Sequence, residues 1–171
     1  MEVREAKIDD IDELKALFAA AIAWQQQRGV PTFTTFPSSF FAQEINKGAV
    51  FVARRDGKLV GTVSLYESDD FIWDNDAAPA LYIHRLASLR TTEGRGVGAA
   101  LIAWSRRRAA ELGKHWLRVD CWADNDELCR FYQRQGFTPV RDKNTGRHAA
   151  LPEHYQNINL RLFQMSAQAE Q

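Results

Sequence analysis

A chain of 171 residues, of which 45% are hydrophobic, is long enough to bury one core of ordinary size. Its 22 Lys and Arg residues balance 22 Asp and Glu residues, which argues against a protein that binds nucleic acid mainly through phosphate contacts. The sequence has no signal peptide, no run approaching the roughly 18 apolar residues of a membrane span, and only two cysteines, without disulfide or metal-ligand spacing. We expect one cytoplasmic domain over residues 1–165 and a polar tail over 166–171.

Strand-like and helix-like runs alternate along this chain. In chain order, we expect a strand at 3–7, a helix from Asp9 or Asp10, a short helix from Ser38 or Ser39, strands at 49–54, 59–66 and 81–89, a helix closed by Gly113, a strand at 115–122, a helix at 125–135, and strands at 137–140 and 158–165. The pair Asp56-Gly57 predicts a hairpin turn between two of these strands. The connection 67–76 is acidic, and the stretch 141–157 is polar.

A glycine-rich stretch lies between the strand at 81–89 and the next helix. Gly94, Gly96 and Gly98 occupy alternate positions there, and apolar residues then repeat at helical spacing. Such a turn leaves backbone N–H groups uncovered, and the helix N-terminus adds further donors and partial positive charge. The spacing fits neither the dinucleotide fingerprint nor the Walker loop. It predicts a cradle for a phosphate or pyrophosphate, although tight-turn geometry alone also explains such glycines.

A second block, residues 125–137, follows the strand at 115–122. Taken together, the two blocks resemble the GNAT superfamily of acyl-CoA-dependent N-acyltransferases. The family's first motif, Gln/Arg-x-x-Gly-x-Gly/Ala, falls in register with residues 93–98. Its second motif is matched in order by Asn125, Cys129, Tyr132, Gly136 and Phe137. The departure is Glu93 at the Gln/Arg position, because a carboxylate repels a pyrophosphate. Arg95 would then supply the positive charge.

The resemblance implies an α/β (α+β) fold with a mixed, mostly antiparallel sheet and helices on both faces. Two central parallel strands, at 81–88 and 115–122, would splay apart to admit acetyl-CoA. The resemblance assigns backbone contacts with the pantetheine arm to Leu86, Ala87 and Ser88, which otherwise are plain core strand. It assigns the pyrophosphate to the N–H groups of Gly94, Arg95, Gly96, Val97, Gly98 and Ala99.

The implied reaction is the attack of an amine on a thioester. The amine must lose a proton before it attacks, and the departing thiolate gains from a nearby acid. Tyr132 matches the family tyrosine that protonates the thiolate, although its apolar helix face also suits a core tyrosine. Asn125 suits a helix cap, and the family lets the same position bind the cofactor arm.

The general base has several candidates. Histidine is a common proton relay in enzymes, and His84 shares one face of an extended strand with Tyr82, Leu86 and Ser88. Asp120, on the neighbouring strand, is a rival base or amine-binding carboxylate, unless Arg118 or Arg85 holds it in a structural pair. Glu67, Tyr82 and water are the weaker alternatives.

The acceptor is expected to be a small-molecule amine, with an aminoglycoside-type antibiotic among the examples. Its proposed contacts are Phe33, Phe36, Tyr82, His84 and Asp120. An acidic cluster in the connection 67–76 would attract a cation, or is merely a solvated loop; it comprises Asp69, Asp70, Asp74 and Asp76. The stretch 141–157 lies where relatives carry a loop that covers the acceptor, alone or in a homodimer.

Three other functions stay open at this level. Protein lysine or N-terminal amines suit the same acidic and aromatic residues. A non-catalytic acyl-CoA sensor with this fold would bind the cofactor without turnover. A module that binds another phosphate ligand at the glycine-rich turn would leave the 125–137 block unexplained. No metal, nucleic acid or membrane partner is expected.

Overall fold

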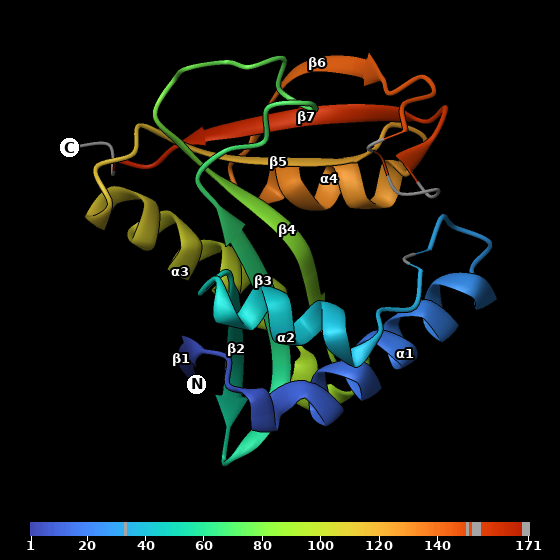
Figure 1. Ribbon diagram of the computed structural model, residues 1–171, viewed down its shortest axis with the longest axis vertical. Coiled ribbons are helices and arrows are strands. Elements are labelled where there is room, and N and C mark those ends of the chain that lie inside the picture. Colours follow the sequence, from blue (N-terminus) through green and yellow to red (C-terminus); the bar gives the residue numbers. More distant parts are fainter. Residues whose placement is uncertain (33, 150, 152–154, 169–171) are drawn as a thin grey trace. The chain divides into compact units, whose positions relative to one another are not determined.

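The computed structural model describes residues 1–32, 34–149, 151 and 155–168 (Figure 1). The chain forms two compact units. The first, called unit 1, comprises residues 1–65 and 84–104, and the second, unit 2, comprises 66–83 and 105–171.

The strands of unit 1 pair in an antiparallel order. β1 (Glu2–Glu5) pairs with β2 (Val50–Arg55), and β2 pairs with β3 (Lys58–Tyr66). The turn between β2 and β3 has left-handed backbone at Asp56 and Gly57, with φ of 52° and 78°. Two such residues are what a two-residue hairpin turn requires, so the hairpin predicted there is confirmed.

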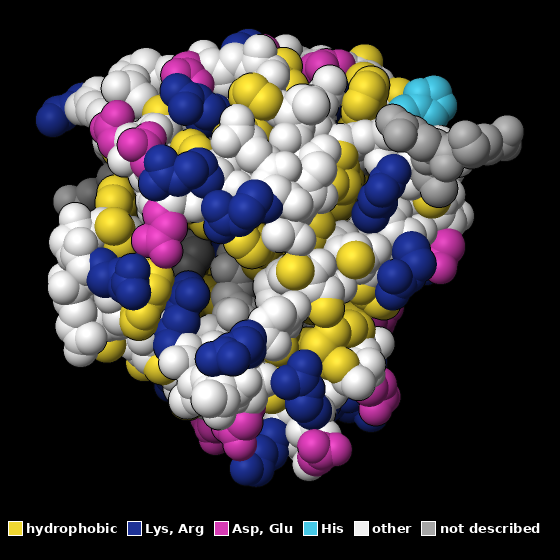
Figure 2. Space-filling model, turned by 180° about the vertical axis from the view of Figure 1, so that it is seen from behind, with side chains coloured by type: hydrophobic (Ala, Val, Ile, Leu, Met, Phe, Trp, Pro, Cys, Tyr) yellow, Lys and Arg dark blue, Asp and Glu magenta, His cyan; other side chains and the backbone are white. Residues whose placement is uncertain are grey.

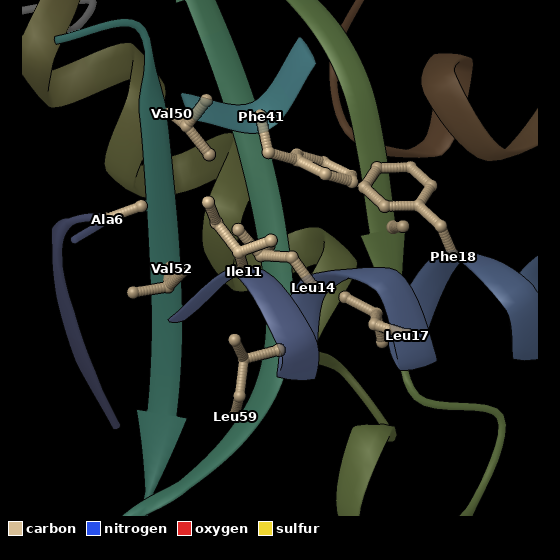
Figure 3. Close-up of a cluster of buried hydrophobic side chains, with 10 residues drawn as sticks. Ala6, Ile11, Leu14, Leu17, Phe18, Phe41, Val50, Val52 and Leu59 are labelled. Carbon is tan, nitrogen blue, oxygen red and sulfur yellow. The ribbon is translucent and has the colours of Figure 1, made fainter. Parts of the chain in front are cut away.

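Two helices cover one face of these strands. α1 (Ile11–Gln27) follows the short helix η1 (Ile8–Asp10), and α2 (Ser38–Asn46) begins at the predicted serine. Figure 3 shows the core that they form with β2 and β3, whose labelled members are Ala6, Ile11, Leu14, Leu17, Phe18, Phe41, Val50, Val52 and Leu59. Ile11, Leu14 and Phe18 recur at helical spacing along α1, so one apolar face of this helix is buried in the unit 1 core.

The opposite face of the unit 1 strands holds α3 (Val97–Glu111). Phe51 lies between Val50 and Val52 in sequence and so points away from α1; its ring centroid is 4.9 Å from that of Trp104. A Cβ on Gly61 of β3 would lie 2.6 Å from Val97 Cγ1. Glycine at this position thus lets the first turn of α3 lie directly against β3.

Unit 2 contains β5 (Trp116–Trp122), β6 (Thr138–Asn144) and β7 (Asn159–Ser166). β7 is antiparallel to both of the others. The first residues of β4 (Ala80–Ser88) run parallel to β5, with Ala80 opposite Trp116 and Ile83 opposite Val119.

Both faces of this part of the sheet are covered within unit 2. One carries an apolar cluster that includes Ile72, Trp73, Tyr82, Leu160 and Leu162. On the other, α4 (Asp126–Arg134) contacts the strands. There the Tyr132 ring lies 6.0 Å from the Phe163 ring, centroid to centroid, and the free thiols of Cys121 and Cys129 have their Sγ atoms 3.7 Å apart.

The strands follow the order β1-β2-β3-β4-β5-β7-β6, with β4 contributing to both units. This order confirms the predicted mixed, mostly antiparallel fold, and the parallel pair is the one expected from 81–88 and 115–122. The splaying of these two strands stays a prediction.

Two boundaries differ from the predicted ones. β6 continues to Asn144, into the stretch expected to be a polar loop, because an edge strand with mostly exposed side chains shows no apolar alternation. The predicted tail begins inside β7, which ends at Ser166, and residues 169–171 are not described. In the described part of the chain, no helix has both the length and the apolar character needed to cross a membrane.

Candidate functional site

The glycine-rich turn of unit 1 joins β4 to α3. After β4 the chain forms the short helix η2 (Thr92–Gly94), and α3 starts at Val97. The first hydrogen bond of α3 runs from Ala100 N to Gly96 O, at 3.0 Å. The N–H groups of Val97, Gly98 and Ala99 therefore precede the helical ladder and have no acceptor within the helix. Such a helix start is suited to an anion.

Two of the glycines are needed for different reasons. A Cβ on Gly94 would lie 1.9 Å from the carbonyl oxygen of Leu89, so only glycine allows the loop to fold back on the end of β4. Gly96 has open space around it but a φ of +75°, which an L side chain rarely adopts. The sequence interpretation of a tight turn and that of an anion cradle are thus both compatible with this geometry.

The carboxylate of Glu93 has a partner in unit 1. Lys58 Nζ lies 3.3 Å from Glu93 Oε1, and the guanidinium of Arg55 donates to the Glu93 carbonyl oxygen at 2.7 Å. The hairpin between β2 and β3 therefore anchors η2, and Lys58 offsets the negative charge at the unusual motif position. Arg95, the expected positive charge of the loop, is exposed.

The end of β4 differs from a plain extended strand. Arg85 has a φ of +49°. Because this left-handed residue interrupts the alternation of side chains, the predicted shared face of Tyr82, His84, Leu86 and Ser88 does not continue past Arg85. His84 is half-buried directly before this irregularity, and Ala87 is buried in the unit 1 core.

In unit 2, helix α4 carries the second motif. Asn125 is the N-cap of α4, and its Oδ1 accepts a hydrogen bond from Leu128 N at 3.0 Å, so the cap interpretation is confirmed. Tyr132 is only 5% exposed and packs edge-to-face on Phe137. Burial, with smaller contributions from Cys121 and Asp120, raises the pKa of the Tyr132 phenol well above its ordinary value. The phenol therefore stays protonated at physiological pH and is able to donate a proton.

Asp120 lies half-buried on β5, with polar side chains near it. The Tyr155 hydroxyl donates to Asp120 Oδ2 at 3.3 Å. A carboxylate oxygen of Asp69 lies within 4.8 Å of one of Asp120. Two carboxylates this close repel each other, so a cation or a shared proton between them is favourable.

Several carboxylates of the acidic connection are exposed and form ion pairs. Lys143 and Arg141 both pair with Asp74, and these contacts lower the pKa of Asp74. Asp76 pairs with Arg118, and Glu67 pairs with Lys114. These carboxylates have cationic partners within unit 2, and the attraction of a cationic amine by the acidic cluster stays a prediction.

Trp73 is a structural residue that sequence reasoning missed, and Arg118, expected as a possible partner of Asp120, packs against it and pairs with Asp76. The guanidinium of Arg118 lies 4.3 Å from the centre of the Trp73 ring and donates to the Tyr82 hydroxyl at 3.1 Å. Trp73, Tyr82 and Arg118 are each 3% exposed. Tyr82 is therefore engaged in a buried cluster rather than presented to a ligand. The triplet Phe-Ile-Trp at 71–73, apolar within an acidic stretch, was the available signal.

The aromatic residues expected on the acceptor side belong to unit 1. Phe36 is half-buried and stacks on Phe40, with ring centroids 4.9 Å apart. The Arg85 guanidinium lies 4.8 Å from the centre of the Phe40 ring. Phe33 falls outside the described residues. Phe36 thus has a packing role, and its contact with an acceptor stays a prediction.

Comparison with known proteins agrees with this geometry. Residues 15–137 match the model of the Acetyltransferase (GNAT) family. The chain is 31% identical over 157 residues to the uncharacterized N-acetyltransferase YesJ of Bacillus subtilis, covering 84% of each chain.

Two solved structures share the fold. The ribosomal-protein-alanine N-acetyltransferase of Brucella melitensis has a TM-score of 0.71 at 20% identity, over 97% of this chain and 99% of that one. The structure of yncA from Salmonella typhimurium with its cofactor acetyl-CoA has a TM-score of 0.70 at 16% identity, over 100% and 96%. The chain belongs to the GNAT family of acetyltransferases, enzymes that transfer an acetyl group from acetyl-CoA.

Proposed function

We propose that this acetyltransferase acetylates the primary amine of a small cationic molecule by direct attack on acetyl-CoA. The observation that carries the proposal is the pair of half-buried carboxylates, Asp69 and Asp120, with oxygens within 4.8 Å of each other. A protonated amine between them relieves their repulsion. The choice of acceptor rests on this pair and no longer on the whole acidic connection.

The cofactor is assigned to unit 1. The N–H groups of Val97, Gly98 and Ala99 suit the pyrophosphate, as does the exposed Arg95. The backbone of residues 86–88 is assigned to the pantetheine arm by family resemblance. Figure 2 shows Lys and Arg side chains scattered over one face of the molecule, among uncharged and hydrophobic side chains and fewer Asp and Glu side chains.

The residues proposed to accept and to donate a proton in the reaction, Asp120 and Tyr132, both belong to unit 2. The amine nitrogen forms a bond with the thioester carbonyl carbon, and the bond from that carbon to sulfur breaks. Asp120 is the proposed acceptor of the amine proton, with His84 or a water as the competing base. Tyr132 is the proposed donor of a proton to the departing thiolate. Burial raises the pKa of this phenol, which keeps it protonated at neutral pH and makes it a weaker acid than an ordinary tyrosine. The proton lost by the amine then restores the phenol through solvent.

Acetyl-CoA turnover, followed by thiol release against a panel of amines, tests the proposal. The panel contains aminoglycosides, polyamines, amino acids, a lysine peptide and a peptide with a free N-terminus. We expect turnover with small cationic amines, and a loss of kcat/KM for them in Asp120→Asn. Asp70→Asn is the matched control, because Asp70 is an exposed carboxylate in the same connection as Asp69.

Other results of the panel contradict parts of the proposal. Turnover with peptides alone would replace the small acceptor by a protein amine. Binding of acetyl-CoA without any turnover would favour a sensor, and a preference for another nucleotide over coenzyme A would remove the cofactor assignment.

A further inference from the structure

The two cysteines of the chain, both in unit 2, lie in contact although they belong to different elements. Cys121 is in β5 and Cys129 is in α4, and their Sγ atoms are 3.7 Å apart. Both are free thiols, and each residue is 5% exposed. The packing of α4 on β5 therefore places two oxidisable sulfur atoms side by side.

A disulfide between these residues requires only a short movement. Its S–S bond would be about 2.05 Å long, so the two sulfur atoms must approach each other by about 1.7 Å. Rotation about the Cα–Cβ bonds and a small shift of α4 supply such a movement. The contacts that hold the Cys129 thiol are weak, because its Sγ lies 3.8 Å from Trp122 O and 3.9 Å from Ala123 O.

Helix α4 also gives an oxidant a route to the two thiols. Of its nine residues, only Cys129 and Tyr132 are buried. A helix with so few buried side chains opens locally at a lower free energy than that of global unfolding. Burial raises the pKa of the Cys121 thiol and keeps it protonated in the closed structure. Cys129, which moves with α4, is therefore assigned as the sulfur that reacts first.

The reaction needs a two-electron oxidant, and hydrogen peroxide is one. The Cys129 thiolate attacks a peroxide oxygen, the O–O bond breaks, and a sulfenic acid and hydroxide form. The Cys121 sulfur then attacks the Cys129 sulfur, the S–O bond breaks, and the S–S bond forms. The peroxide takes up both thiol protons and two electrons from the sulfur atoms, and it leaves as two molecules of water. A thiol reductant reverses the oxidation by thiol–disulfide exchange.

The disulfide would also move the proposed acid of the reaction. Tyr132 lies three residues after Cys129, on the same buried face of α4. Its ring packs on Phe137 and Phe163, with centroid distances of 5.6 Å and 6.0 Å. A shift of α4 toward Cys121 displaces this ring, and a misplacement of about 1 Å at a reacting group lowers turnover by about 10²-fold.

We propose that Cys121 and Cys129 form a reversible redox site, whose disulfide links α4 to β5 and displaces Tyr132. The effect on turnover rests on the proposed role of Tyr132 as the acid, whereas the formation of the disulfide does not.

Mass spectrometry of the oxidised wild-type protein tests the redox site directly. Both cysteines fall in one tryptic peptide, residues 119–130, between Arg118 and Arg130. The protein is treated with hydrogen peroxide or oxidised glutathione and then with N-ethylmaleimide in denaturant. We expect a peptide without alkyl groups, lighter than the reduced peptide by two hydrogen atoms. Dithiothreitol should restore two alkylatable thiols, and Cys121→Ala should instead carry a sulfenic acid or a glutathione adduct at Cys129.

Hydrogen exchange and turnover measure the consequence of oxidation. The disulfide should slow amide exchange in α4 by about tenfold or more, because it suppresses the opening of this helix. The kcat should fall by about 10²-fold after peroxide treatment and recover with dithiothreitol. Cys129→Ala is the matched control, and peroxide should leave its kcat at the value of its own untreated form.

Two results would overturn the proposal. One is a folded protein in which peptide 119–130 keeps both thiols, or gains glutathione on them, in place of the internal bond. The other is a fully oxidised protein with unchanged α4 exchange and unchanged kcat, which would remove the effect on Tyr132. Because the mass and exchange measurements need no acceptor, inactivity toward every amine would contradict the proposed function and leave this test intact.

Discussion

Replacing Gly94 by Ala should weaken cofactor binding by about as much free energy as it removes from the stability of the fold. The added Cβ would lie 1.9 Å from the carbonyl oxygen of Leu89, and the nearest Leu89 atoms are backbone, which cannot rotate away. The loop must therefore move by about 1.5 Å to restore an ordinary contact distance.

A displacement of that size is large for a hydrogen-bond cradle. An N–H···O bond of about 2.9 Å stretched by about 1.5 Å lies outside hydrogen-bonding range. Hydrogen bonds to a charged group contribute about 1.5–3 kcal/mol each. The loss of one such bond raises the Kd for acetyl-CoA by roughly 10- to 100-fold. The strain itself lowers the free energy of unfolding by about 1–3 kcal/mol, as other overpacked sites do.

Isothermal titration calorimetry with acetyl-CoA, paired with thermal unfolding, measures both effects. Gly113→Ala is the control, because Gly113 ends α3 with a φ of +69° and open space around it. That variant should lose about 1 kcal/mol of stability through backbone strain and keep the wild-type Kd. The loss of one hydrogen bond should raise the Kd for acetyl-CoA by roughly tenfold or more. A folded Gly94→Ala protein whose Kd lies within about twofold of the wild-type value would therefore refute the cradle assignment.

Three further predictions concern other parts of the molecule. Tyr132→Phe should lower kcat by about 10²- to 10⁴-fold with little change in acetyl-CoA affinity, the range for loss of a general acid; normal turnover at every pH would remove Tyr132 from the mechanism. Lys58→Met leaves the Glu93 carboxylate without its ion-pair partner and should raise the Kd for acetyl-CoA a few-fold, whereas the double variant with Glu93→Gln should restore the wild-type Kd. If calorimetry gives Lys58→Met and the wild type the same Kd, the ion pair has no such role. Burial alone would raise the pKa of Asp10, but hydrogen bonds from Arg4, the Lys7 N–H and Arg54 outweigh burial and lower this pKa. Denaturant titrations should therefore show that the free energy of unfolding of the wild type falls as the pH drops below about 4, and that it falls less in Asp10→Asn. The same pH dependence in both proteins would contradict this account.

Much of the fold and part of the site follow from local sequence. The hairpin at Asp56-Gly57, the start of α2 and the helix cap at Asn125 each depend on a few adjacent residues whose backbone preferences are strong. The two family motifs likewise lie in short blocks, which is why the glycine-rich turn before α3 and the helix α4 were predicted with nearly correct bounds. The role of that turn as a phosphate cradle stays a prediction. Edge strand β6 was underestimated because exposed side chains carry no apolar period.

The tertiary structure decided the features that join distant residues. Lys58 and Glu93 are 35 positions apart, and Arg118 and Asp76 are 42 apart, so no local pattern pairs them. The sequence by itself determined the tight turns, the helix caps and the apolar faces of the helices, since these depend on the backbone preferences and spacing of neighbouring residues. Which charges have partners depends on burial and on residues that only folding brings together, and for that reason the ion pairs of the acidic connection could not be predicted from the sequence.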